Sequence, residues 1–154
     1  MADVQKIKYA HTNLVTPDWK RLADFYVGVF DCVVVPPERD LAGRWLDDAT
    51  SISHAHIQGV HVRLPGYGDL GPTLEIFQYD SELERTSTAV NRPGLGHLAF
   101  AVENVRAAHA AVIAAGGREV GQIVTTEIAG AGIIEFAYVT DPDGNVIELQ
   151  QWQK

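Results

Sequence analysis

The strongest constraint on the fold of this chain is an internal repeat, since its two halves carry similar patterns in the same order. The first half begins with an alternating run that contains His11, and the second begins with a similar run that follows His97. Each half continues through a polar break and a helical pattern, and it closes on an apolar run with one glutamate, Glu75 or Glu148. The repeat therefore predicts two similar modules.

Within each half, the order of the patterns predicts one strand, one helix and three further strands. Asp18 and Asn104 precede the two helical patterns, and both residue types cap the first turn of a helix. Gly116 and Gly117 are expected to end the second helix. A turn at 141–145 joins the last two strands as a hairpin. The expected strands cover 8–15, 32–35, 52–64, 73–79, 98–102, 119–124, 133–139 and 146–151.

These elements predict an α+β fold that contains two tandem βαβββ modules. The length of 154 residues favours a single domain, 1–154. The first module is expected over 5–90 and the second over 91–154, where the loop at 91–94 separates them.

Strand alternation places the repeated histidines and glutamates on one kind of face. Side chains of a strand point alternately to its two sides, so Glu75 lies opposite its aliphatic neighbours. The same alternation applies to Glu148, His11 and His97. If the two sheets curve, all four residues point into one concave surface, which is a typical setting for a binding site.

Two imidazoles and two carboxylates form a nitrogen and oxygen donor set, so we expect one divalent metal ion, Ni, Co, Mn, Fe or Zn. A single strand histidine or glutamate is more often structural, and the recurrence of both types in both halves is what favours a metal site. Four protein ligands leave two octahedral positions for water or substrate. A metal so held can stabilise an enediolate, and a carboxylate beside it can move a proton on and off carbon.

Charge and composition limit the partners that we expect. The formal net charge of -8 argues against nucleic acids and anionic membranes, so a small-molecule substrate is expected. The one cysteine, Cys32, excludes an intrachain disulfide and fits a reducing compartment. The first ten residues lack the pattern of a signal peptide, and no apolar run is long enough to span a membrane. We therefore expect a cytoplasmic protein.

The run from His11 to Asp18, with Phe25 and Tyr26 seven residues later, resembles the opening of the vicinal-oxygen-chelate superfamily. That superfamily includes glyoxalase I, methylmalonyl-CoA epimerase, extradiol dioxygenases, and the bleomycin and fosfomycin resistance proteins. The segments 74–76, 96–102 and 141–149 resemble the family's later signatures. The resemblance implies paired βαβββ modules that form an open barrel-like cup around a metal site, commonly in homodimers.

The ligand set His11, Glu75, His97 and Glu148 is similar to that of bacterial glyoxalase I of the nickel or cobalt type. This similarity implies a metal-dependent lyase or isomerase that acts on a small carbonyl or thioester substrate, with Glu148 as the catalytic base. Epimerases usually carry Gln at position 75, and extradiol dioxygenases need no ligand there.

Three alternatives to a lyase stay open. They are a methylmalonyl-CoA-epimerase-like enzyme, an extradiol-dioxygenase-like oxygenase, and a metal-free protein that sequesters a drug in the cup. The chain also departs from glyoxalase I at Asn145, at Phe30 and Asp31, and in an insert over 36–58, which leaves the substrate undefined.

Further polar and aromatic residues of the first half are candidates for substrate contacts. Asn13 and Phe77 fall near the predicted ligands, and His61 and Arg63 share a strand face. An arginine there can hold a carboxylate or phosphate in bidentate fashion. His54 and His56 lie in the same stretch, and we disfavour them as a second metal pair because no carboxylate lies at a matching step.

Overall fold

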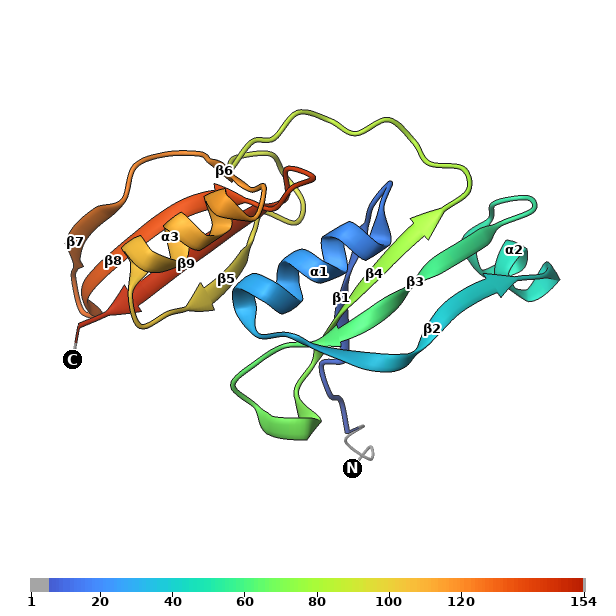
Figure 1. Ribbon diagram of the computed structural model, residues 1–154, viewed down its shortest axis with the longest axis horizontal. Helices are drawn as coiled ribbons and strands as arrows, with labels where there is room; N and C mark the ends of the chain where they lie inside the picture. The colour runs from blue at the N-terminus through green and yellow to red at the C-terminus, as the bar shows by residue number, and fades with distance from the viewer. Residues whose placement is uncertain (1–5, 154) are drawn as a thin grey trace, which may run out of the picture. The chain divides into compact units, whose positions relative to one another are not determined.

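The computed structural model describes residues 6–153. The expected first-module start at residue 5 and the chain end at residue 154 lie outside the described residues. The described residues form two compact units, 6–27 with 31–82, and 28–30 with 83–153. Each unit contains one mixed sheet of parallel and antiparallel strands, which confirms the expected α+β class of two modules (Figure 1).

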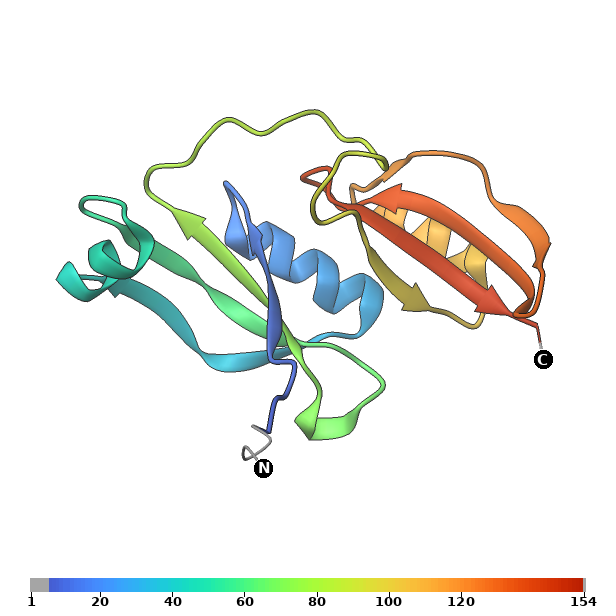
Figure 2. The same cartoon turned by 180° about the vertical axis from the view of Figure 1, so that it is seen from behind.

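The first unit is built on a four-stranded sheet in the order β1-β4-β3-β2. Strand β1 pairs parallel with β4, and the other neighbours are antiparallel. Figures 1 and 2 show α1 alongside one face of this sheet. In chain order its elements are β1 His11–Val15, α1 Trp19–Phe30, β2 Val33–Ala42, α2 Arg44–Thr50, β3 His56–Arg63, the short 3-10 helix η1 Gly68–Leu70 and β4 Thr73–Tyr79.

Helix α1 forms as the sequence predicts, because both its cap and its apolar spacing are in place. The Asp18 side chain accepts a hydrogen bond from the Arg21 backbone N–H at 3.1 Å, which satisfies one of the free donors of the first turn. Leu22 and Tyr26, four residues apart on one helical face, are 1% and 0% exposed. The helix ends at Asp31, whose φ of 55° breaks the helical repeat.

The segment 36–58 differs from the expected strand pattern. Strand β2 continues to Ala42 instead of ending at residue 35, with a register shift against β3 between Val35 and Arg39. Prolines at 36 and 37 are tolerated because β2 is an edge strand, where a missing N–H breaks no internal pairing. Helix α2 was not expected, since Leu46 is its one buried side chain and leaves no helical periodicity to read.

The second unit has strands β5, β9, β8 and β6 in that order, and β7 also pairs with β8. Strand β5 is parallel to β9, as β1 is to β4 in the first unit. Helix α3 contacts β8 and β9, and the Asn104 side chain caps it by accepting from the Ala107 N–H at 2.9 Å. Its elements are β5 Leu98–Ala101, α3 Val105–Ala114, β6 Arg118–Glu119, β7 Val124–Ile128, β8 Gly132–Thr140 and β9 Val146–Trp152.

One expected strand of the second unit, 119–124, was wrong. The structure divides it into β6 and β7, and residues 120–123 belong to neither strand. The Val120 N–H still donates to the Tyr138 carbonyl oxygen of β8 at 3.1 Å. Gly121 lies in this break, and glycine weakens a strand interior because it has no side chain to pack.

The hairpin between β8 and β9 is fixed by one buried carboxylate. Asp141 is 0% exposed, and its Oδ1 accepts hydrogen bonds from the backbone N–H groups of Asp143 and Asn145, both at 3.0 Å. The Asn145 side-chain amide donates to the other oxygen at 2.7 Å. The turn therefore sets where β9 begins and which of its side chains alternate inward.

Within residues 6–153, no helix is both long and apolar enough to cross a membrane.

Candidate metal centre

The register of the first sheet places three polar side chains in one row across β1, β4 and β3. Glu75 on β4 is paired with Asn13 on β1 and with His61 on β3. His11 occupies the neighbouring row, opposite Thr73. Directly paired residues on adjacent strands point to the same side of a sheet. The cluster is therefore a consequence of strand pairing alone.

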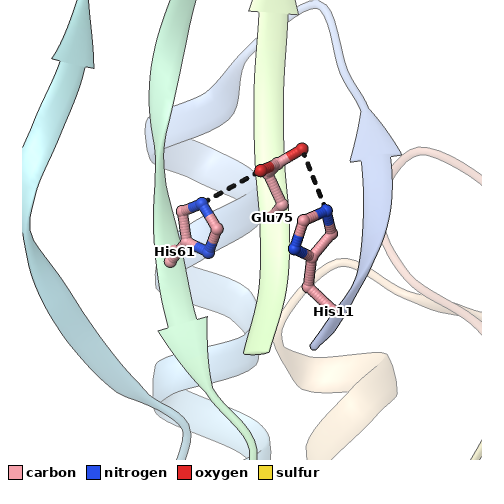
Figure 3. Close-up of side chains that lie close together, drawn as sticks. All are labelled: His11, His61 and Glu75. Carbon is pink, nitrogen blue, oxygen red and sulfur yellow. Dashed lines mark ion pairs between the residues drawn. The ribbon is translucent and has the colours of Figure 1, made fainter. Parts of the chain in front are cut away.

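In this cluster, neighbours hold both oxygens of the Glu75 carboxylate. The Asn13 side-chain amide donates to Oε1 at 3.0 Å, and His11 Nε2 lies 3.5 Å from the same oxygen. His61 Nε2 lies 3.0 Å from Oε2. Figure 3 shows His11 and His61 pointing at the glutamate from its two sides, on the face of the sheet away from α1. One ligand atom from each of His11, His61 and Glu75 lies within 4.8 Å of the others.

The cluster is partly shielded from solvent. The side chains of Glu75 and His61 are 17% and 16% exposed, and that of His11 is 40% exposed. Burial lowers the pKa of His61, and this effect outweighs the opposite effect of the nearby Glu75 carboxylate. A neutral imidazole is the form that a metal ion requires.

The second unit contains the corresponding pair. His97 Nε2 lies 3.1 Å from Glu148 Oε2, and the Glu148 side chain is 16% exposed. Glu148 on β9 is paired with Ala99 on β5 and with Tyr138 on β8. Burial, and then the nearby carboxylate of Glu148, raise the pKa of Tyr138. The row Ala99–Glu148–Tyr138 thus corresponds to the row Asn13–Glu75–His61.

Both pairs have the spacing of metal ligands. Two donor atoms bound to one ion at about 2.0–2.2 Å lie about 3.0–3.5 Å apart, and the two histidine–glutamate distances are 3.5 and 3.1 Å. The set of candidate ligands contains no thiolate. Cys32 is buried, and this burial, with a smaller effect of the nearby Asp31 carboxylate, raises the pKa of its thiol to about 12. The donors fit a borderline or hard divalent cation. Each histidine–glutamate pair forms between residues of a single unit.

The expected substrate contacts have different surroundings. Asn13 and His61 both contact Glu75, as described above. Arg63 lies opposite Thr73 in the next row, and its Nη1 is 3.8 Å from the exposed Asp69 carboxylate. Phe77 is 8% exposed and packs in a core cluster with Leu46, Ala55 and Ile57. Its ring edge also faces His61, with the ring centroids 6.1 Å apart.

Sequence reasoning missed two features near these residues. Thr73 Oγ1 lies 2.8 Å from His61 Nδ1, and its position two residues before Glu75 was the available signal. His56 has Asp40 Oδ1 2.6 Å from one ring nitrogen and Asp80 Oδ2 2.8 Å from the other. His54 precedes β3 with a φ of 56°, so the two histidines do not share a strand face.

Comparisons with known proteins identify the family and the fold. The model of the Glyoxalase/Bleomycin resistance protein/Dioxygenase superfamily matches residues 8–149. A glyoxalase family protein from Bacillus cereus has a similar structure with a TM-score of 0.84 at 16% identity, covering 100% of this chain and 99% of that one. No curated protein sequence matches this chain.

Two further solved structures are similar at lower TM-scores. A glyoxylase/bleomycin resistance protein/dioxygenase domain from Frankia sp. has a TM-score of 0.60 at 20% identity, covering 97% of this chain and 95% of that one. A glyoxalase I variant from Zea mays has a TM-score of 0.62 at 19% identity, covering 96% of this chain and 45% of that one.

Proposed function

This chain belongs to the Glyoxalase/Bleomycin resistance protein/Dioxygenase superfamily, and from that premise we propose that it is a metal-dependent lyase or isomerase. Its substrate is a small carbonyl or thioester compound. The observation that carries the proposal is the recurrence of a histidine–glutamate pair at corresponding strand positions of the two units. A protein that needed only to enclose an apolar ligand would gain nothing from keeping both pairs.

The proposed ligands of one divalent ion, Ni, Co, Mn, Fe or Zn, are His11, Glu75, His97 and Glu148. A bound ion of this kind supplies Lewis-acid stabilisation to substrate oxygens that gain negative charge. Asn13 keeps the Glu75 carboxylate turned toward His11. Arg63, one row away, is the cation available to hold an anionic part of the substrate.

Glu148 is the proposed general base. Its carboxylate lies beside His97 and is largely shielded from solvent, which keeps bulk water from competing for the proton that it moves. A carboxylate so placed removes a proton from the carbon beside a carbonyl and returns it to a neighbouring atom. His61, Asn13 and Phe77 stay proposed substrate contacts.

We also propose that the protein works on small molecules in the cytoplasm as a homodimer. The acidic net charge of -8 supports small-molecule partners over nucleic acids. The single cysteine, Cys32, supports a reducing compartment. The homodimer rests on the resemblance to the superfamily.

Metal analysis combined with two assays tests the proposed function. Purified protein is stripped, reloaded with Ni, Co, Mn or Zn, and assayed for hemithioacetal isomerisation and for acyl-CoA epimerisation. We expect about one ion per chain and turnover in the first assay only when a metal is bound. Turnover in the second assay alone would favour the epimerase. Failure to bind any of the four metals, with retention of an apolar drug, would favour a sequestering protein.

A further inference from the structure

We propose that His61 is a further metal ligand, so that the first unit holds the divalent ion through His11, His61 and Glu75 without help from the second unit. The inference rests on the proposed function, because it takes Glu75 to be a ligand. It adds a third donor within the first sheet.

The first support is the direction of the His61 ring. Its Nε2 lies 3.0 Å from Glu75 Oε2, while His11 Nε2 approaches the other oxygen of the same carboxylate. The rings of His11 and His61 are 5.5 Å apart between centroids and meet edge to face. Two imidazoles and one carboxylate on one face of a sheet form the donor set of a three-ligand site with open positions (Figure 3).

The second support is the partner of the remaining ring nitrogen. A histidine that binds a metal through one nitrogen usually donates its other N–H to an oxygen, which fixes the ring and its tautomer. Thr73 Oγ1 lies 2.8 Å from His61 Nδ1 and can accept that hydrogen bond. The side chain of His61 therefore has its outer partner in place, and Nε2 is the nitrogen turned toward the cluster.

The third support is the contrast with the second unit. Tyr138 occupies the position opposite Glu148 that His61 occupies opposite Glu75. The Tyr138 ring lies beside His97 with the ring centroids 5.2 Å apart, so a phenol can pack against the histidine of its own unit as His61 packs against His11. An imidazole at position 61 adds a donor atom that packing does not require, and only the first unit has it.

A competing role for His61 is to hold Glu75 in place by a hydrogen bond. The neutral ring can donate from Nε2–H to Glu75 while it accepts from the Thr73 hydroxyl at Nδ1. Glutamine at position 61 separates the two roles, because its amide can still donate to Glu75 whereas its neutral oxygen binds these metals more weakly than an imidazole nitrogen does.

The experiment uses the full chain with Co²⁺ as the probe, followed by its d–d absorption and by equilibrium binding. The double variant His97→Ala with Glu148→Ala removes the second pair. We expect it to bind one Co²⁺ more weakly than the unsubstituted protein does. Adding His61→Gln should lower that affinity by more than the roughly 10- to 100-fold that loss of an outer partner costs. Adding His54→Gln instead, at an exposed histidine outside the cluster, should leave the affinity unchanged.

The outcomes separate this inference from the proposed function. Co²⁺ binding that vanishes in the double variant overturns the inference and leaves the proposed function standing, whereas an unsubstituted protein that binds no Co²⁺ overturns the proposed function. If circular dichroism shows that the double variant does not fold, the single variant His61→Gln is compared with the unsubstituted protein by its Co²⁺ absorption spectrum. A changed Co²⁺ absorption spectrum is expected, and an identical spectrum shows that His61 is no ligand.

Discussion

At the scale of single residues, the orientation of Glu75 depends on its neighbours in the strand row. Asn13 donates to Oε1 and His61 lies against Oε2, so each oxygen has a fixed partner. Holding a carboxylate in a single orientation before the metal arrives reduces the ordering that binding must impose. Asn13 is therefore expected to contribute to metal affinity through the orientation of Glu75, without contacting the ion.

Asn13→Ala tests this contribution. Removing the amide frees Oε1 to rotate away from His11, so we expect metal affinity to fall about 10- to 100-fold with the fold retained. Alanine suits the position, because Ala99 stands at the corresponding place in the second unit. Calorimetric titration with Co²⁺ measures the effect, and Asn91→Ala in an exposed loop is the control. An unchanged affinity would mean that Asn13 does not position the ligand.

Glu148→Gln tests the proposed general base. Glutamine has nearly the same shape but accepts no proton, so we expect turnover to fall by about a hundredfold to ten-thousandfold. Thermal unfolding should stay within a few degrees of the unsubstituted protein. Steady-state kinetics on metal-loaded enzyme provides the measurement, with Glu127→Gln on the exposed β7 as the control. A fully active variant would exclude Glu148 from proton transfer.

At the scale of elements, β3 is held to β2 and to the end of β4 by His56. Its ring lies between the Asp40 and Asp80 carboxylates, and the hydrogen bonds to these two groups raise the pKa of His56. A histidine whose pKa is raised by folding stabilises the folded state while it is protonated. This contribution is complete below the unfolded pKa of about 6.5 and is lost as pH rises through the folded value.

His56→Gln should therefore destabilise the protein more at pH 5.5 than at pH 8.5. The raised pKa gives the sign, since the unsubstituted folded state binds the proton more tightly than the unfolded state does. Urea unfolding at the two pH values checks it, and His54→Gln, whose side chain is exposed, is the matched control. Equal losses at both pH values would show that the ion pairs do not contribute.

Gly59 allows β3 and β4 to approach closely beside the metal cluster. A Cβ at this position would lie 2.0 Å from the Ile76 carbonyl oxygen, which is backbone and cannot move aside cheaply. Gly59→Ala should therefore destabilise the fold by about 1–3 kcal/mol and weaken metal binding through displacement of His61. Denaturant unfolding and Co²⁺ titration measure the two effects. Gly28→Ala, with nothing within 4 Å of the added carbon, should leave metal binding unchanged.

The elements with strong periodicity could be predicted from the sequence, and the others could not. Helix α1 and strands β4 and β9 follow from regular apolar spacing and capping side chains. Helix α2 has one buried residue, Leu46, and its existence depends on contacts with Ala55 and Ile57 that only the folded chain creates. The contact of Thr73 with His61 likewise depends on strand pairing, because alternation places Thr73 on the same face as Glu75 but does not say which residue of β3 lies beside it.

At the scale of the whole molecule, the repeat predicted the two modules that the structure contains. Strand alternation predicted that the four histidines and glutamates lie opposite their aliphatic neighbours, but it did not predict that one histidine–glutamate pair forms within each unit. The differences between the units were less predictable. Asn13 and His61 were expected as substrate contacts, whereas residues 99 and 138 attracted no expectation. The place of all four beside a glutamate depends on the strand register.

Metal binding should stabilise the molecule as a whole. A ligand at a free concentration a hundredfold above its Kd adds about 2.7 kcal/mol to the free energy of unfolding, which for a chain of this size corresponds to a Tm increase of roughly 5–10 °C. Thermal unfolding with Ni²⁺ or Co²⁺ and after chelation measures the shift. Ca²⁺, which prefers sites built from oxygens alone, should produce none. A Tm independent of all metals would contradict the metal site.

The two glutamates of the repeat have unequal freedom. Glu75 has a polar side chain on each flanking strand, whereas Glu148 has Ala99 on one side and a contact with His97 at 3.1 Å. A carboxylate beside a methyl group can swing without breaking a hydrogen bond on that side. Duplicated modules can in this way diverge into a stationary carboxylate and a mobile one through the residue that stands on the neighbouring strand.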